Sequence, residues 1–171
     1  MGTTVLKVSK KTSKKKVNRI ALVIDDSGSM NGLRAELVKA FNDNVDTIVS
    51  QARKTKQRTG VSLFMFGDGV QRRYSNATVG DVSKLTVAEY TAEGGSTPLY
   101  DAVGTAIVEL DSMPVGTDED VSNLIIVMTD GGENSSKEYS AAAAQGVVKT
   151  LTDKEWSVVF LGANLDAMQG S

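Results

Sequence analysis

The sequence predicts an α/β domain in which a doubly wound, mostly parallel sheet is covered by helices on both faces. Candidate strands alternate with candidate helices along the chain, which is the pattern of a parallel sheet with helical crossovers. Residues 20–24 and 124–128 are unbroken apolar runs, as expected of strands buried on both faces. Both runs break at once into polar residues, and right-handed crossovers place such strand ends at one edge of the sheet.

Length and composition indicate one globular domain. The chain has 171 residues, of which 40% are apolar and 23% charged, and such a chain can bury a substantial core. It contains no Cys and no His, which excludes a disulfide framework, thiolate and imidazole metal ligands, and Ser-His-Asp catalysis. No apolar run approaches the roughly 18 residues of a membrane span, and no secretory signal is visible. We therefore expect a cytoplasmic protein that contacts no membrane.

Charge divides the chain into a basic, flexible arm at residues 1–17 and a domain at residues 18–171. Seven of the 19 basic residues precede Ile20 without any acidic residue, and the remainder carries 12 basic and 21 acidic residues, a formal charge of −9. Such an arm suits nucleic acid or another anionic surface. A solvated leader, or an edge strand kept soluble by Lys, is the alternative. We favour the alternative because the arm has no aromatic residue to stack on bases.

The elements after the first strand follow from periodicity and turn residues. Apolar residues recur at helical spacing over residues 33–54, which predicts an amphipathic helix. Residues 61–66 form the second strand, and the Gly67-Asp68-Gly69 link predicts a hairpin to residues 70–74. This third strand is therefore antiparallel to its neighbour, and its arginines suit a sheet edge. Residues 80–85 indicate a short helix or turn.

A second helix begins at residue 98, because Thr97 and Pro98 supply a hydroxyl at the N-cap and a proline at the first helical position. Apolar residues continue at helical spacing to Leu110, and residues 111–120 indicate an acidic surface loop. The remaining predicted elements are the strand at residues 124–128, an Ala-rich helix at residues 139–151 and a fifth strand at residues 156–161.

Oxygen-bearing side chains gather at the predicted carboxyl edge of the sheet. The first strand is followed by Asp25, Ser27 and Ser29, Thr97 begins a helix after a double glycine, and Asp130 follows the strand at residues 124–128. Alternate residues of an extended segment point the same way, so the first three side chains converge. Carboxylate and hydroxyl oxygens suit Mg²⁺, Mn²⁺ or Ca²⁺. The local alternative makes these residues helix caps and turn residues.

This arrangement resembles the von Willebrand factor type A (VWA) domain with its metal-ion-dependent adhesion site. The family pattern is Asp-x-Ser-x-Ser, a distant Thr, and an Asp that ends a later strand. Residues 25–29, Thr97 and Asp130 match this pattern in order, within a resemblance that runs from Asn18 to Ala163. It implies a Rossmann-like sheet of order 3-2-1-4-5 with strand three antiparallel.

The resemblance also implies a function and a role for each residue of the pattern. Ser27, Ser29 and Thr97 would bind the metal through hydroxyl oxygens, and Asp25 and Asp130 would bind it directly or through water. An acidic residue of a partner protein would complete the coordination, so the domain would be a non-enzymatic protein-interaction module. Intracellular members of the family often serve as adaptors, and this sequence resembles those because it lacks a signal peptide and Cys.

Three further expectations concern residues outside the pattern. Asp26 is expected to face outward or to cap the following loop. The chain ends ten residues after Leu161, whereas the family usually adds a sixth strand and a final helix, so the domain is expected to lack both. Residues 156–161 would then be an apolar, uncharged edge strand, which predicts a homo-oligomer through that edge.

Two other functions fit parts of the sequence. Asp25 after a buried strand resembles the nucleophile of Mg²⁺-dependent haloacid-dehalogenase-type phosphatases. In that family a second Asp follows two residues later, and here the position holds Ser27. The Lys-rich arm at residues 1–17 offers the other alternative, a nucleic-acid accessory protein.

Overall fold

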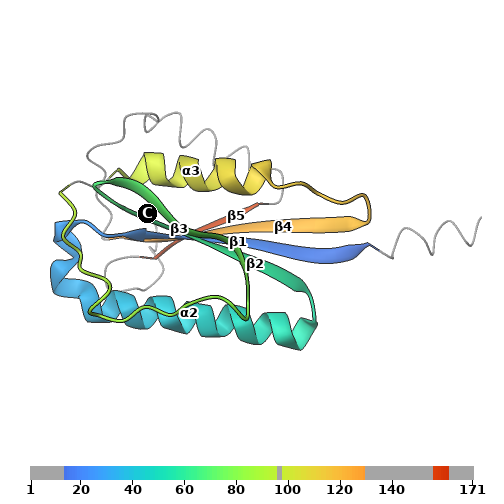
Figure 1. Ribbon diagram of the computed structural model, residues 1–171, viewed down its shortest axis with the longest axis horizontal. Coiled ribbons are helices and arrows are strands. Elements are labelled where there is room, and N and C mark those ends of the chain that lie inside the picture. The colour runs from blue at the N-terminus through green and yellow to red at the C-terminus, as the bar shows by residue number, and fades with distance from the viewer. Residues whose placement is uncertain (1–13, 96–97, 130–155, 162–171) are drawn as a thin grey trace, which may run out of the picture.

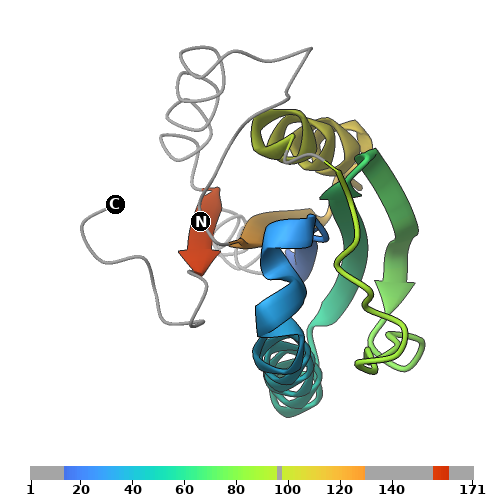
Figure 2. The ribbon, with the colours of Figure 1, turned by 90° about the vertical axis from the view of Figure 1, so that its left-hand side faces the viewer.

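The computed structural model describes residues 14–95, 98–129 and 156–161, in which five strands form one sheet between two helices (Figure 1). Helix α2 covers one face of the sheet and α3 covers the other (Figure 2). The predicted helix at residues 139–151 lies outside the described residues. Among those residues, no helix is both long and apolar enough to cross a membrane.

In chain order the elements are β1 (Lys15–Asp25), the short 3-10 helix η1 (Gly28–Leu33), α2 (Arg34–Thr55), β2 (Arg58–Gly67), β3 (Gly69–Thr78), α3 (Leu99–Ser112), β4 (Glu119–Met128) and β5 (Ser157–Leu161).

The strand order is β3-β2-β1-β4-β5, which confirms the predicted fold class and topology. Strand β1 lies in the middle, parallel to both of its neighbours, so that Leu22 pairs with Leu63 of β2 and with Ile126 of β4. Strand β3 is antiparallel to β2, as the hairpin at Gly67 and Gly69 predicts. The carboxyl ends of β1, β2, β4 and β5 therefore meet at one edge of the sheet, here called the carboxyl edge.

Two hydrophobic clusters fix the helices to the sheet, and β1 contributes to both. Ile20, Leu22 and Ile24 pack in the cluster of α2, whereas Ala21 and Val23 pack in the cluster of α3. Four of these five side chains have no solvent exposure, and Ile20 is 8% exposed. The unbroken apolar run is thus explained by burial on both faces.

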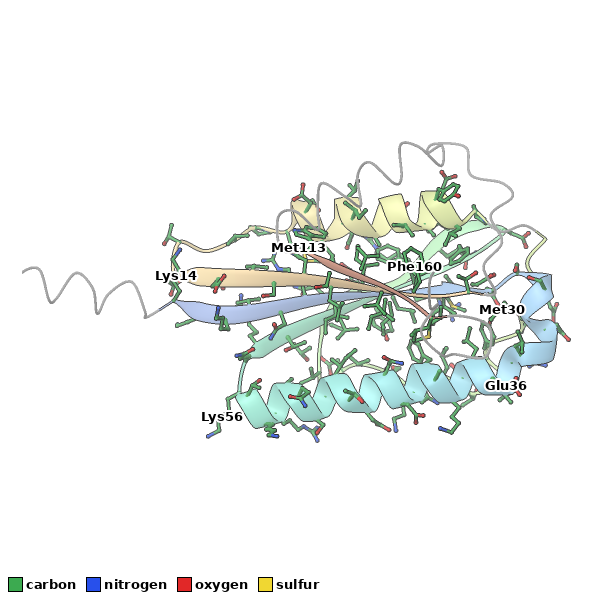
Figure 3. The ribbon with its side chains drawn as sticks, turned by 180° about the vertical axis from the view of Figure 1, so that it is seen from behind. Lys14, Met30, Glu36, Lys56, Met113 and Phe160 are labelled. Atoms are coloured by element: carbon green, nitrogen blue, oxygen red, sulfur yellow. The ribbon has the colours of Figure 1, made fainter. Side chains whose placement is uncertain are left out.

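Strands β1 and β4 begin five residues earlier than the apolar runs predict, at Lys15 and Glu119. Ion pairs between the two segments support these extensions. Lys16 forms an ion pair with Asp120, and Nζ of Lys15 lies 3.9 Å from Oδ2 of Asp118. Part of the predicted basic arm is therefore a strand, and part of the predicted acidic loop is its neighbour. This end of the sheet lies opposite the carboxyl edge, as Lys14 and Met30 show in Figure 3.

The chain after β3 runs back along α2 to the carboxyl edge, and its last part is called the 85–95 strap (Figure 1). Asn42 of α2 binds both main-chain groups of Leu85, each at 2.9 Å. Arg34 donates to the carbonyl oxygen of Tyr90 at 2.8 Å and also to that of Val87. Side chains of α2 therefore hold a segment that has no regular structure of its own.

Candidate metal centre

Asp25 ends β1 at the carboxyl edge and is fixed by contacts from three parts of the chain. Its side chain has no solvent exposure. Oδ1 accepts a hydrogen bond from the main-chain N–H of Ser27 at 2.9 Å, and Oδ2 accepts one from Oγ1 of Thr129 at 2.8 Å. The Tyr90 hydroxyl donates to the carbonyl oxygen of Asp25. The carboxylate is therefore held in one orientation beside the loop at residues 25–29, here called the metal loop.

Ser27 and Ser29 place two hydroxyl oxygens side by side on the metal loop. The distance between the two Oγ atoms is 2.9 Å, which is a hydrogen-bond distance. It is also the spacing of adjacent ligands in octahedral Mg²⁺ coordination, because bonds of about 2.1 Å at right angles put neighbouring ligands roughly 3.0 Å apart. Ser27 is 3% exposed and Ser29 is exposed, so the pair runs from the interior to the surface.

The structure supports only part of the local alternative, in which these side chains serve as helix caps and turn residues. Ser27 precedes η1, but its side chain makes no capping hydrogen bond to that helix. The contact from the Ser27 N–H to Asp25 is a local turn of the kind that Asp commonly makes. A local turn therefore accounts for one oxygen of Asp25, and neither capping nor this turn explains why the two serine hydroxyls meet.

Thr97 and Asp130, the other two predicted ligands, lie outside the described residues. A described residue close to each of them in the sequence contacts the metal loop. Thr129, which precedes Asp130, contacts Asp25 as stated above. Gly94, three residues before Thr97, forms a parallel bridge with Ser27. The chain therefore contacts the metal loop shortly before each of the two predicted ligands.

Gly94 is where the 85–95 strap packs against the metal loop. Its N–H donates to the carbonyl oxygen of Asp26 at 2.9 Å, and its own carbonyl oxygen accepts from the N–H of Gly28 at 2.8 Å. A Cβ atom at Gly94 would lie 2.6 Å from Cα of Gly67, so only glycine fits between the two backbones. Glycine at this position therefore allows the backbones of the strap and of β2 to approach closely.

Asp26 neither faces outward nor caps the loop that follows it, the two positions expected from the sequence; it is half-buried and its side chain binds the strap. Its Oδ1 accepts a hydrogen bond from the Ala92 N–H at 2.8 Å. Burial raises the pKa of this carboxyl above its ordinary value, an effect that the Ala92 N–H and nearby Arg73 oppose. The sequence pattern assigns every second residue of the loop to the metal and leaves the partner of Asp26 undetermined.

Two further residues of the centre, Tyr90 and Thr129, were missed by sequence reasoning. Tyr90 is a single aromatic residue in a polar stretch, and its side chain is fully buried. Thr129 directly precedes a predicted ligand at a strand end, and it is 1% exposed. Both signals are weak, because neither residue type identifies its partner across the sheet.

The donor chemistry of the described centre fits a hard divalent cation. It offers one carboxylate and two hydroxyls, without nitrogen or sulfur ligands. No group of three or more His, Cys, Asp or Glu that could hold a metal occurs within residues 14–95, 98–129 and 156–161. A metal at this edge would therefore be held largely by neutral oxygens. The single described carboxylate would balance one of the two positive charges of such a cation.

Solved structures share this fold at low sequence identity. The pilus adhesin SpaC from Lactobacillus rhamnosus GG is 17% identical with a TM-score of 0.64; the match covers 88% of this chain and 24% of that chain. Proximal thread matrix protein 1 from the mussel byssus is 18% identical with a TM-score of 0.55, over 86% of this chain and 36% of that chain. The von Willebrand factor domain of the pilus tip protein Mfa5 from Porphyromonas gingivalis is 17% identical with a TM-score of 0.52, over 81% and 52%.

These similarities show the fold alone, and this chain spans between about a quarter and about half of those three chains. A search of curated protein sequences gives no match. The profile of the von Willebrand factor type A domain, in contrast, matches residues 20–169, which is most of the chain. Together with the strand order and the position of the metal loop, this match shows that the chain belongs to the von Willebrand factor type A domain family.

Proposed function

We propose that this VWA domain is a protein-interaction module that binds an acidic residue of a partner protein through a divalent cation. The cation is Mg²⁺, with Mn²⁺ or Ca²⁺ as substitutes, and its ligands are Asp25, Ser27, Ser29, Thr97 and Asp130. The observation that carries the proposal is the pair of serine hydroxyls, 2.9 Å apart, beside a buried and fixed carboxylate. Thr97 and Asp130 enter the ligand set through the family pattern.

The charge of the ligand set favours a carboxylate partner. Three of the five proposed ligands are neutral hydroxyls, and Asp25 and Asp130 can act through bound water, so the cation keeps electrophilic character and an exchangeable coordination position. Ser29 is exposed, so a cation bound to its hydroxyl would lie at the surface, where an incoming Asp or Glu could reach it. Contacts between a carboxylate and such a cation are strong where water is partly excluded, as for other charge-assisted contacts.

The phosphatase alternative is less well supported than the binding module. In that mechanism a second Asp, two residues after the nucleophile, acts as acid and base, and here that position holds Ser27, whose hydroxyl cannot take this role. We therefore expect no hydrolysis of an aryl phosphate in the presence of Mg²⁺. The nucleic-acid alternative is weakened because Lys15 and Lys16 face Asp118 and Asp120. The cytoplasmic location expected from the sequence stays a prediction.

Partner binding should depend on the metal. Immobilised protein with Mg²⁺ should retain its partner from a lysate of the native host, and EDTA should release it, because removing the cation removes the bridge between the two proteins. A column of Thr97→Ala protein should retain markedly less of the same partner without loss of fold. A partner that stays bound in EDTA would contradict a metal-bridged contact.

We also propose self-association through the outer edge of β5. This strand ends the sheet, and within the described residues no other strand pairs with that edge. Its sequence, Ser-Val-Val-Phe-Leu, has no charge, and Val159 is 38% exposed. An apolar edge strand of this kind is a template for pairing with another chain.

The self-association predicts a particle larger than a monomer. Light scattering at micromolar concentration should report it, and Val159→Lys should reduce the particle to a monomer because a charge opposes edge-to-edge pairing. The matched control is Val108→Lys, a change at a 57% exposed valine of α3 that should leave association unaltered. A monomeric wild-type protein would contradict the proposal.

A further inference from the structure

We infer that Asp26 is a positioning residue that fixes the 85–95 strap against the metal loop, and that the affinity for the cation depends on this contact. The inference rests on the proposed function, because it assigns a residue that sets the geometry of the same centre. Asp26 lies between Asp25 and Ser27, and its side chain turns away from theirs to reach the Ala92 N–H at 2.8 Å.

The main chain of the metal loop is joined to its surroundings on both sides of Asp26. The Asp26 N–H donates to the carbonyl oxygen of Phe66 on β2 at 2.7 Å. The Asp26 carbonyl oxygen accepts from Gly94, and the Gly28 N–H donates back to Gly94. The loop therefore lies between β2 and the strap, and Ser27 lies within the joined stretch. A displaced strap would move the loop that carries the serine hydroxyls.

The strap needs a side chain to hold it at this point because its backbone is strained. Ala92 has φ 51°, in the left-handed region that residues other than glycine rarely adopt, and it is 1% exposed. Strained residues of this kind persist only where surrounding contacts hold them. Asp26 supplies such a contact from the metal loop, and Asp68 supplies a second one at the Gly95 N–H, 2.7 Å away.

Two other roles for Asp26 make different predictions. If its negative charge attracted the cation, an uncharged replacement would weaken metal binding whatever its shape. If Asp26 only stabilised the fold, a replacement would lower the melting temperature and leave the metal affinity unchanged. Asp26→Asn keeps an oxygen that accepts from Ala92 and removes the charge, whereas Asp26→Ala removes both. Comparison of these two variants separates the effect of positioning the strap from the effect of the negative charge on the cation.

The experiment measures two quantities on the whole chain. The first is the dissociation constant for Mn²⁺, from the free-ion signal in electron paramagnetic resonance. The second is the hydrogen exchange rate of the Ala92 amide, from nuclear magnetic resonance of the metal-free protein. Asp43→Ala is the control, because Asp43 is an exposed carboxylate that pairs with Lys39 on α2, away from the metal loop. Melting curves show that each variant is folded.

We expect Asp26→Ala to raise the dissociation constant about tenfold or more, as residues that support metal ligands commonly do, and to speed exchange at Ala92. Asp26→Asn should stay near the wild type in both quantities, as should Asp43→Ala.

An unchanged dissociation constant in Asp26→Ala overturns the inference, and so does a loss of affinity in Asp26→Asn with Ala92 still protected. Absence of Mn²⁺ binding to the wild type overturns the proposed function, whereas unchanged Ala92 exchange in Asp26→Ala overturns the positioning role alone.

Discussion

Mg²⁺ or Mn²⁺ should raise the melting temperature of the wild-type domain, and Ser29→Ala should remove most of that rise. A ligand bound only by the folded state stabilises it by mass action, by about 2.7 kcal/mol at a hundred times the dissociation constant. For a domain of this size such a gain corresponds to roughly 5–10 °C. Ser29 is the best first replacement because it is exposed, so its loss costs the metal-free fold little. A thermal denaturation series with and without metal measures the effect.

The choice of variants matters because the proposed ligands differ in burial. Asp25→Ala would remove the acceptor for the Ser27 N–H and for Thr129 in a site without solvent, which would destabilise the fold directly. Asp25→Asn keeps the size of the side chain and is the fairer test at that position. Ser83→Ala, at an exposed serine outside the metal loop, is the matched control for Ser29→Ala. A full metal-dependent rise in both Ser29→Ala and Asp130→Ala would contradict the ligand assignment.

The parallel sheet, its hairpin and the position of the metal loop could be predicted because they depend on strong local signals, whereas the full strand order was predicted from the resemblance to the VWA family. The apolar run in β1 indicates a central strand, and the glycines at 67 and 69 indicate the hairpin to β3. Once these elements are in order, the rules of parallel connection bring the end of β1 and the end of β4 to one edge. Asp25 and Thr129 meet there as a consequence, although 104 residues separate them in the chain.

What could not be predicted depends on contacts between segments that carry no periodic pattern. The 85–95 strap has neither helical nor strand spacing, so nothing in it indicates that Tyr90 reaches Asp25 or that Ala92 reaches Asp26. The early starts of β1 and β4 were missed for a related reason. Exposed strand ends hold charged residues, and only the cross-strand pairs, such as Lys16 with Asp120, reveal that they are strands.

Gly94→Ala is expected to be among the most damaging small substitutions in this domain. The added Cβ would lie 2.6 Å from Cα of Gly67 and 2.9 Å from the carbonyl oxygen of Asp26, and both of these are backbone atoms. Because backbone cannot turn aside as a flexible side chain can, the strap and the metal loop must separate. Overpacking of this kind costs about 1–3 kcal/mol. We expect the destabilisation by Gly94→Ala to lie near the upper end of this range, which corresponds to a fall in melting temperature of roughly 6–12 °C.

The same change should remove the metal-dependent rise in melting temperature, because separation breaks the hydrogen bonds that join Gly94 to Asp26 and Gly28. Gly32→Ala is the matched control: it adds the same methyl group in η1, where no atom lies within 4 Å of the new Cβ. This control should melt close to the wild type and keep the full response to Mg²⁺. If Gly94→Ala also melts within about 1 °C of the wild type, a difference of well under 1 kcal/mol, the strap does not depend on this close approach. If it melts lower but keeps the metal response, the strap contributes to the fold and not to the metal centre.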